Sequence, residues 1–301
     1  MSASGASLPP GGESPPPSSG TPAQPSSREP NHARRYGAIW IISSLIVTPL
    51  VIFVLGPILP PGHGSEAASG HVTDNTVLLA MATPVLLMVV IYMLYAIVYF
   101  RQPKGGVLEG PAQRGNARVQ TTWIVVTSLL VLSLATYGTF RLFENGAGSG
   151  SGPDPLTVPH GAKLPVQVIA QQWAFTYRYP TYGGVETPHL VLPEGKMIEL
   201  HVTSLDVIHS FWAYQLGVKA DANPGVDNVA FVKPTKLETF EVHCAELCGI
   251  WHGYMFDHGQ VVTPAAFETW IHHQQTAFAP ATKVLPPYSK TYLPEPTRRA
   301  E

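Results

Sequence analysis

The sequence predicts a membrane-anchored all-β protein, in which transmembrane helices are followed by a β-sandwich. Three apolar runs, residues 38–59, 77–100 and 122–143, each approach the ~20 residues needed to span a bilayer. From residue 164 onward, short runs rich in β-branched and aromatic residues alternate with Gly and Pro. We therefore expect a transmembrane helical hairpin, an extra N-terminal transmembrane helix, and a β-sandwich after them.

Composition sets limits on the partners of the protein. The 301 residues are 45% hydrophobic and 13% charged, with a formal net charge of -2. Such a balance lacks the basic surface that a nucleic acid would require. We therefore expect a lipid bilayer as a partner and no nucleic acid.

The first apolar run follows a tail, residues 1–35, that is rich in Pro, Ser and Gly. That composition predicts a disordered cytoplasmic segment. The run could alternatively be a cleaved signal sequence, because small residues such as Ala67 follow it. Its length favours a retained helix, so residues 36–144 are expected to hold three transmembrane helices.

Basic residues around the apolar runs predict the orientation in the membrane. Residues 60–76 contain no Lys or Arg, whereas both the tail and the link between the second and third runs are basic. The flanking basic residues are Arg28, Arg34, Arg35, Arg101, Lys104, Arg114 and Arg118. The N-terminus is therefore expected in the cytoplasm and the domain after the third helix outside the membrane.

The region after the third run divides into a linker, a domain and a tail. Residues 145–157 are a Gly/Ser-rich linker. Residues 158–280 are the expected extracytoplasmic domain, ending in a helix capped by Thr263 with Pro264 at its first position. The tail, residues 281–301, has no periodicity and receives no structural assignment. Strands are expected at residues 164–179, 189–192, 197–204, 207–214, 229–232, 237–243 and 260–263.

A cluster of soft ligand atoms lies near the end of this domain. Cys244, Cys248, His252 and Met255 follow one another within twelve residues, and His209 lies upstream in a strand-like run. Thiolate, thioether and imidazole groups are the ligands that favour copper. The alternatives are a disulfide between the two cysteines, a zinc site that has no use for the thioether, and core packing of Met255 and His209.

Four motifs give the chain a specific resemblance. It resembles subunit II of the haem-copper cytochrome c oxidases, a membrane-anchored subunit with a cupredoxin-like Greek-key β-sandwich. The motifs are Gln172-Trp173-Ala-Phe175-Thr-Tyr177, Asp206-Val-Ile-His209-Ser-Phe-Trp, Lys219-Ala-Asp221-Ala-Asn-Pro224-Gly225, and the segment from Cys244 to Met255.

The resemblance implies a binuclear copper centre, called CuA, with two copper ions. Cys244 and Cys248 would be thiolates that bridge the two metals. The other implied ligands are the imidazoles of His209 and His252, the thioether of Met255 and the backbone carbonyl of Glu246. Trp251, Tyr254 and Phe256 would form an apolar shell around the metals.

The resemblance also implies contacts beyond the copper ions. The Glu246 side chain would face a Mg²⁺ at the interface with the catalytic subunit, unless it is only a solvated loop carboxylate. Trp173 resembles the tryptophan through which electrons reach CuA from cytochrome c, although a core tryptophan is the alternative. Asp206 and Asp221 would serve the docking surface or the subunit interface, or else stabilise turns.

Three positions depart from the family pattern. Phe175 replaces the second aromatic of a Trp-x-Trp pair, and Arg178 lies where better-known members carry an acid. Docking through an acidic patch is therefore in doubt. Gln120 lies where many relatives have a glutamate of a proton channel, and an amide cannot titrate.

The function expected is electron transfer within a terminal oxidase. The chain would accept electrons from a c-type cytochrome and pass them to catalytic subunit I, which holds the haem and reduces O2 to water, with subunit III as a further partner. The expected location is a bacterial cytoplasmic membrane, with the CuA domain on the periplasmic side. The alternatives are a CuA subunit of a nitric oxide reductase and a membrane-tethered copper-binding or delivery β-sandwich without electron transfer.

Overall fold

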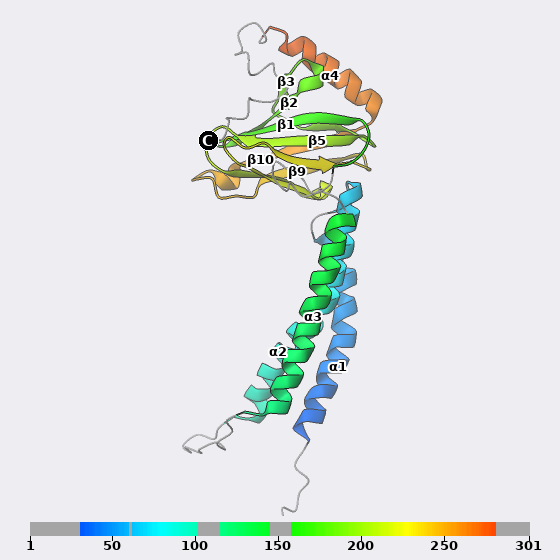
Figure 1. The fold of residues 1–301 in the computed structure, drawn as a ribbon, viewed down its shortest axis with the longest axis vertical. Coiled ribbons are helices and arrows are strands. Elements are labelled where there is room, and N and C mark those ends of the chain that lie inside the picture. The colour runs from blue at the N-terminus through cyan, green and yellow to red at the C-terminus, as the bar shows by residue number, and fades with distance from the viewer. Residues whose placement is uncertain (1–30, 60–61, 102–114, 145–157, 281–301) are drawn as a thin grey trace, which may run out of the picture.

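The computed structural model describes residues 31–59, 62–101, 115–144 and 158–280 (Figure 1). Long helices lie below a β-sandwich, and a shorter helix lies above it. The tail before residue 31, the linker at 145–157 and the tail from 281 lie outside the described residues. The expectations for those segments therefore remain predictions.

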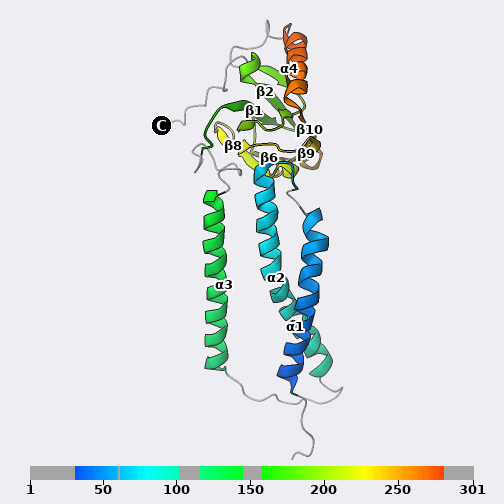
Figure 2. The same cartoon turned by 90° about the vertical axis from the view of Figure 1, so that its right-hand side faces the viewer.

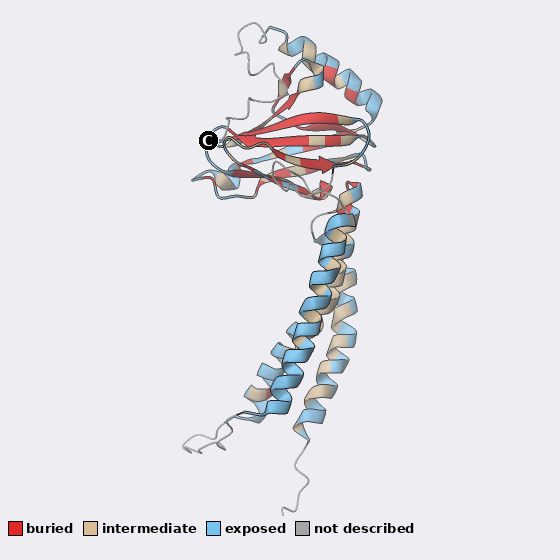
Figure 3. Ribbon diagram, viewed as in Figure 1, coloured by how far each residue is buried: buried red, intermediate tan, exposed pale blue. Residues whose placement is uncertain are grey.

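Among the described residues, three helices are long and apolar enough to cross a membrane. α1 spans His32–Leu50 and continues through a π-helical turn, Val51–Leu55, and a 3-10 turn, Gly56–Ile58; α2 spans Glu66–Tyr99 and α3 spans Ala117–Glu144. Most of their side chains are exposed or half-buried, as apolar helices in a bilayer would be (Figure 3). The expected tail extended too far, because Asn31 caps α1 by accepting a hydrogen bond from the Arg34 N–H.

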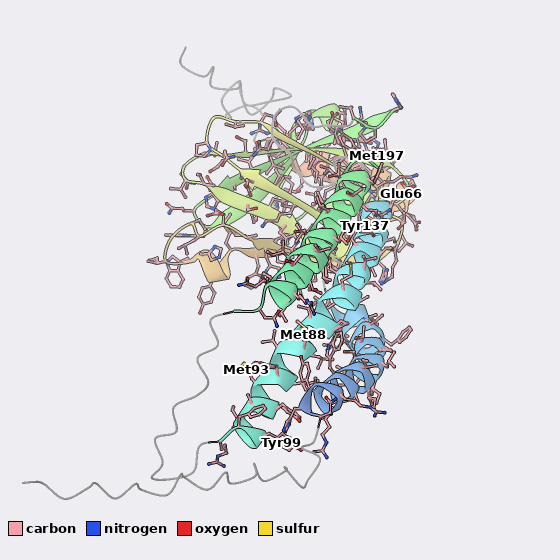
Figure 4. The ribbon with its side chains drawn as sticks, turned by 60° about the horizontal axis from the view of Figure 1, so that its bottom comes forward. Glu66, Met88, Met93, Tyr99, Tyr137 and Met197 are labelled. Atoms are coloured by element: carbon pink, nitrogen blue, oxygen red, sulfur yellow. The ribbon has the colours of Figure 1, made fainter. Side chains whose placement is uncertain are left out.

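Polar side chains join the helices at different levels. Trp40 Nε1 donates to the Pro84 carbonyl of α2 at 2.8 Å, and the Tyr36 hydroxyl donates to the Met88 carbonyl at 2.9 Å. Helices α1 and α2 lie side by side, and α3 stands away from them (Figure 2). Tyr137 of α3 lies near the Glu66 end of α2 (Figure 4), and its hydroxyl donates to Asp74 at 2.9 Å.

Two five-stranded sheets form the sandwich, which confirms the predicted membrane-anchored all-β class. One sheet has the order β3-β2-β1-β5-β8 and the other β4-β10-β9-β6-β7. The strands of the first sheet are β1 Lys163–Gln171, β2 Ala174–Tyr179, β3 Val185–Thr187, β5 Met197–Ser204 and β8 Asn228–Val232. Those of the second are β4 Val191–Pro193, β6 His209–Ala213, β7 Val218–Ala222, β9 Glu238–Cys244 and β10 Phe256–Val262.

The strand pattern corrects the sequence prediction at several places. The single run expected at 164–179 is a hairpin, because the chain turns at Gln172 and Trp173 between β1 and β2. β3 and β7 were not predicted. β10 begins at Phe256, four residues before the expected strand.

The core lies between the sheets, where the strands are mostly buried (Figure 3). α4, Pro264–Phe278, begins at the predicted cap, since Thr263 accepts from the Ala266 N–H. Its Phe267 is buried and contacts the ring of Tyr179, with centroids 6.1 Å apart. The helix therefore covers the edge of the sandwich near β3 and β4.

The first turn of α2 is built into the sandwich. Ser65 caps the helix, and its hydroxyl also donates to the Leu216 carbonyl at 2.5 Å. Gly217 has φ +65°, and a Cβ there would lie 2.8 Å from the Cα of Ala68. Only glycine allows this close approach. The junction therefore ties the second sheet, which carries the candidate site, to a membrane-spanning helix.

Candidate metal centre

Two neighbouring strands and one loop bring the soft ligand atoms together. His209 begins β6 and Cys244 ends β9, and these strands pair antiparallel, with Phe211 opposite Cys244. The loop from β9 to β10 carries Cys248, His252 and Met255. At its base the Cys244 N–H donates to the Met255 carbonyl at 3.0 Å. Residues 35 positions apart in sequence therefore meet at one end of the second sheet.

The distances place the ligand atoms around one small volume. The two sulfurs, Cys244 Sγ and Cys248 Sγ, are 3.7 Å apart. His209 Nδ1 lies 3.9 Å from Cys244 Sγ, and His252 Nδ1 lies 3.6 Å from Cys248 Sγ. Met255 Sδ lies 3.8 Å from Cys248 Sγ. Each sulfur thus has an imidazole nitrogen beside it.

These residues fit a group of soft metal ions. A metal-sulfur bond of about 2.3 Å allows one ion to contact two sulfurs up to about 4.6 Å apart, and the observed separation is 3.7 Å. His209, Cys244 and Cys248 form a buried group able to hold a metal ion. Met255 is only 1% exposed, with its thioether facing the thiols. The donor set is suited to copper.

The disulfide alternative is wrong for this structure. Both cysteines are free, and their sulfur separation of 3.7 Å far exceeds the ~2.05 Å of a disulfide bond. Burial and the neighbouring Cys244 thiol raise the pKa of Cys248 to about 12. A metal that binds here must therefore displace a tightly held proton.

Asp206 fixes the orientation of one imidazole. Its Oδ1 lies 2.9 Å from His209 Nε2, which leaves Nδ1 directed toward Cys244. Burial opposes ionisation of Asp206, but hydrogen bonds from the Gln172 N–H, the His209 ring and the Val207 N–H lower its pKa to about 2. A carboxylate that holds a ligand imidazole in this way sets its tautomer and orientation.

Glu246 contributes two groups that point to different places. Its backbone carbonyl accepts from Cys244 Sγ at 3.2 Å, so the carbonyl oxygen lies beside the thiols. Its side chain is exposed. The geometry is compatible with a carbonyl ligand on one side and a carboxylate facing a partner on the other.

Trp173 lies beside the thiolate loop, half-buried. Its indole Nε1 donates to the Cys248 carbonyl at 3.1 Å. Gly249 has φ +118°, and a Cβ there would lie 3.2 Å from the indole ring. Trp173 therefore combines contact with the loop and partial access to solvent.

The apolar shell expected from Trp251, Tyr254 and Phe256 is wrong. Trp251, Tyr254 and Phe256 are 50%, 71% and 52% exposed, so they face outward and do not enclose the ligands. The buried rings beside the site belong to Phe211 and Phe175, whose centroids are 5.9 Å apart. The outward-facing rings are available to a partner.

Other predicted positions lie away from the ligands. Asp221 accepts a hydrogen bond from Ser210 at 2.7 Å, which joins β6 to β7. Arg178 is buried in an ion pair with Glu186, so it adds no basic charge to an exposed docking face. Gln120 is exposed on α3. The possible docking role of Asp221 stays a prediction.

One contributor at the site was not singled out from the sequence. The side-chain amide of Gln172 donates to the Cys248 carbonyl at 2.9 Å. Its position before Trp173 was the available signal, but a glutamine beside a turn has no distinctive pattern. The structure shows the contact because it brings the β1–β2 turn against the loop.

The β-sandwich and its soft donor set define a cupredoxin-like, membrane-anchored class of metal protein. A sequence profile described as the periplasmic domain of cytochrome c oxidase subunit II matches residues 185–262. Cytochrome c oxidase subunit 2 of Thermostichus vulcanus is 29% identical over 285 residues, covering 79% of this chain and 86% of the relative. The corresponding subunit of Synechocystis is 26% identical, covering 64% and 69%.

The chain belongs to the cytochrome c oxidase subunit II family. Among solved structures, the periplasmic domain of subunit II of the cytochrome oxidase of Bradyrhizobium japonicum is 32% identical to it. That match covers 40% of this chain and 99% of the other, with a TM-score of 0.39.

Proposed function

We propose that this chain is the electron-transfer subunit of a haem-copper terminal oxidase, working through a CuA centre. Membership of the subunit II family makes it a partner of other oxidase subunits, and the chain alone is not the catalytic subunit. One observation carries the CuA proposal. The two cysteine sulfurs lie 3.7 Å apart, and each of them has the Nδ1 atom of a different histidine beside it.

The proposed ligands divide into strong and weak donors. Cys244 and Cys248 would supply the bridging thiolates, and the remaining donors are the imidazoles of His209 and His252, the Met255 thioether and the Glu246 carbonyl. When bound, a binuclear copper centre supplies a one-electron relay whose charge is shared by two metals. The buried ligands exclude water, and the hydrogen-bonded loop holds them with little room to rearrange.

Trp173 is proposed as the point at which electrons reach the site from a c-type cytochrome. The support is the 3.1 Å hydrogen bond from its indole to the Cys248 carbonyl and the partial exposure of the ring. Exposed aliphatic side chains lie on two neighbouring segments: Leu205, 60% exposed, follows β5 and donates its N–H to the Ala170 carbonyl of β1, and Ile250, 84% exposed, follows Gly249. An apolar rim favours a donor that docks through apolar contact more than through opposite charge.

Further contacts are proposed for the assembled oxidase. The exposed Glu246 carboxylate would help to bind Mg²⁺ at the interface with catalytic subunit I, which carries the haem. Subunit III is a further proposed neighbour. A bacterial cytoplasmic membrane is the proposed location, and the charge pattern of the loops favours the N-terminus inside and the β-sandwich on the periplasmic face.

Rapid-mixing kinetics with a reduced c-type cytochrome tests the proposal. Replacement of Trp173 by Phe should slow electron arrival at the copper site by more than tenfold, because the indole and its hydrogen bond are both lost, while the copper content stays unchanged. Trp270→Phe on α4 is the control and should react at the wild-type rate. A normal rate in Trp173→Phe would remove the proposed role of this residue.

A further inference from the structure

The turn between β1 and β2 is hydrogen-bonded to the Cys248 loop and to Asp206, the residue that holds His209. On one side, the Gln172 side-chain amide and the Trp173 indole both donate to the Cys248 carbonyl, at 2.9 and 3.1 Å. On the other side, the Gln172 backbone N–H donates to Asp206 Oδ2 at 2.7 Å. The same Asp206 carboxylate holds His209 through Oδ1.

These contacts form a continuous hydrogen-bonded path between two proposed ligands, His209 and Cys248, which lie on different elements. His209 begins β6, whereas Cys248 lies in the loop after β9. The path runs from the His209 ring through Asp206 to the Gln172 backbone, and from the Gln172 amide to the Cys248 peptide. Gln172 is the one residue of this path that contacts both Asp206 and Cys248.

The local packing is shaped to accept the amide. Gly249 follows Cys248, whose carbonyl accepts the two hydrogen bonds. A Cβ on residue 249 would lie 3.1 Å from Gln172 Nε2 and 3.3 Å from Trp173 Nε1. A side chain on residue 249 would therefore crowd both donors, in a backbone conformation that L residues rarely adopt. Because residue 249 is glycine, both the Trp173 indole and the Gln172 amide can approach the Cys248 carbonyl.

We infer that Gln172 is a positioning residue that fixes the Cys248 peptide against the Trp173 indole. Two donors on one carbonyl restrict rotation of the peptide that follows the Cys248 side chain. With the amide removed, the peptide can tilt, so the indole hydrogen bond opens more often and Cys248 Sγ shifts relative to His209. The inference rests on the proposed function, because it assigns Trp173 to electron transfer.

Gln172→Met provides the test, since methionine keeps the length of the exposed side chain and removes the donor. Gln171→Met is the matched control: residue 171 is its exposed neighbour, and its side chain makes no hydrogen bond within the described residues. Both variants are made in the full chain in detergent micelles, with ¹⁵N-labelled tryptophan. Trp173→Phe identifies the indole signal of Trp173.

Solvent exchange of the Trp173 indole proton is measured first, in the metal-free chain. The Trp173 indole proton should exchange about fivefold faster in Gln172→Met than in wild type, which is the change expected when the stabilisation of about one hydrogen bond is lost. Gln171→Met should match wild type. Equal exchange in all three proteins would overturn the inference. Because no copper is needed, the result is decisive even if the variant binds copper poorly.

The copper-loaded chains give the second measurement. Gln172→Met should shift the reduction potential and the copper hyperfine splitting and slow reduction by a c-type cytochrome, while Gln171→Met changes none of them. An unshifted potential and a normal rate would contradict a positioning role. If Trp173→Phe reduces normally while Gln172→Met still shows fast indole exchange and a shifted potential, the proposed path of electrons fails but the positioning of Cys248 stands.

Discussion

At the scale of single residues, backbone hydrogen bonds help to hold the segments that carry the proposed ligands. The Cys244 N–H donates to the Met255 carbonyl, and the Ala245 N–H donates to the Ser210 carbonyl at 2.9 Å. Neither bond uses a ligand atom. Replacement of one ligand side chain should therefore change metal binding while the sandwich stays folded.

The two sulfur ligand types should respond differently to substitution. Cys248→Ser removes a proposed bridging thiolate, so copper content should fall to one ion or none. Met255→Leu conserves volume at a buried position and removes only a weak donor, so both copper ions should stay and the reduction potential should shift. Copper analysis and redox titration of the purified chains check this. Similar mild effects of both substitutions would indicate that the two residues only pack.

The raised pKa of Cys248 gives a prediction for pH dependence. With a pKa of about 12, the thiol is protonated at neutral pH, and the reactive thiolate increases as pH rises. Alkylation of Cys248 in the metal-free chain should therefore keep rising about tenfold per pH unit from pH 8 to 10, beyond the pKa of about 8.5 of a free thiol. Peptide mapping by mass spectrometry measures the rate. A plateau near pH 9 would contradict the assigned environment.

At the scale of elements, the junction with α2 lies at the end of β6 and the start of β7, the end of these strands opposite His209. Ser65 is fully buried and caps α2 while donating to Leu216. The Glu66 N–H donates to the Lys233 carbonyl at 3.1 Å. The helix and the second sheet should therefore unfold together.

A pair of glycine substitutions tests that junction. Gly217 and Gly183 have φ +65° and +76°, so alanine costs about 1–2 kcal/mol at either position through the left-handed backbone alone. Gly217→Ala also forces a contact with Ala68, whereas Gly183 faces open space. Thermal unfolding should therefore show a clearly larger loss of stability for Gly217→Ala. Equal losses of stability in the two variants would mean that Ala68 moves away from residue 217 without a cost in free energy.

Much of the fold could be predicted because long apolar runs and strongly alternating strands have clear patterns. β7 was missed because its buried positions include Ala220 and Ala222, whose small side chains give a weak apolar signal. β3 has only three residues. The hairpin inside 164–179 was missed because Gln172 and Trp173 interrupt the apolar pattern without Gly or Pro.

The ligand residues could be proposed from the sequence because soft donors are rare in this chain, which has two cysteines and six methionines. The supporting contacts could not be predicted in the same way. Asp206 acts on His209 three residues away, but Gln172 reaches Cys248 across 76 positions. Only the packing of the β1–β2 turn against the loop reveals that contact.

At the scale of the whole molecule, α1 is integrated into the membrane part through specific contacts with α2. Trp40 and Tyr36 donate to two carbonyls of α2, and His32 Nδ1 lies 2.7 Å from the Tyr95 hydroxyl. The Pro84 carbonyl belongs to the proline inside α2, and the Met88 carbonyl lies about one turn after it. These contacts favour a retained helix over a cleaved signal sequence.

Intact-mass analysis of the chain purified from membranes tests retention of α1. The mass should include residues 32–58, because the hydrogen bonds from Tyr36 and Trp40 to α2 favour a helix that stays part of the protein. Trp40→Phe, which removes one of these bonds, should lower the thermal stability of the membrane part modestly, by about 1 kcal/mol. A mature N-terminus after Ala67 would contradict retention.

The central claim is that two thiolates of this chain hold two electronically coupled copper ions. Copper analysis combined with EPR spectroscopy of the reconstituted full chain tests it most directly. The account predicts two copper ions per chain and the hyperfine pattern of one unpaired electron shared by both nuclei. A single bound copper, or an unpaired electron confined to one copper nucleus, would contradict it.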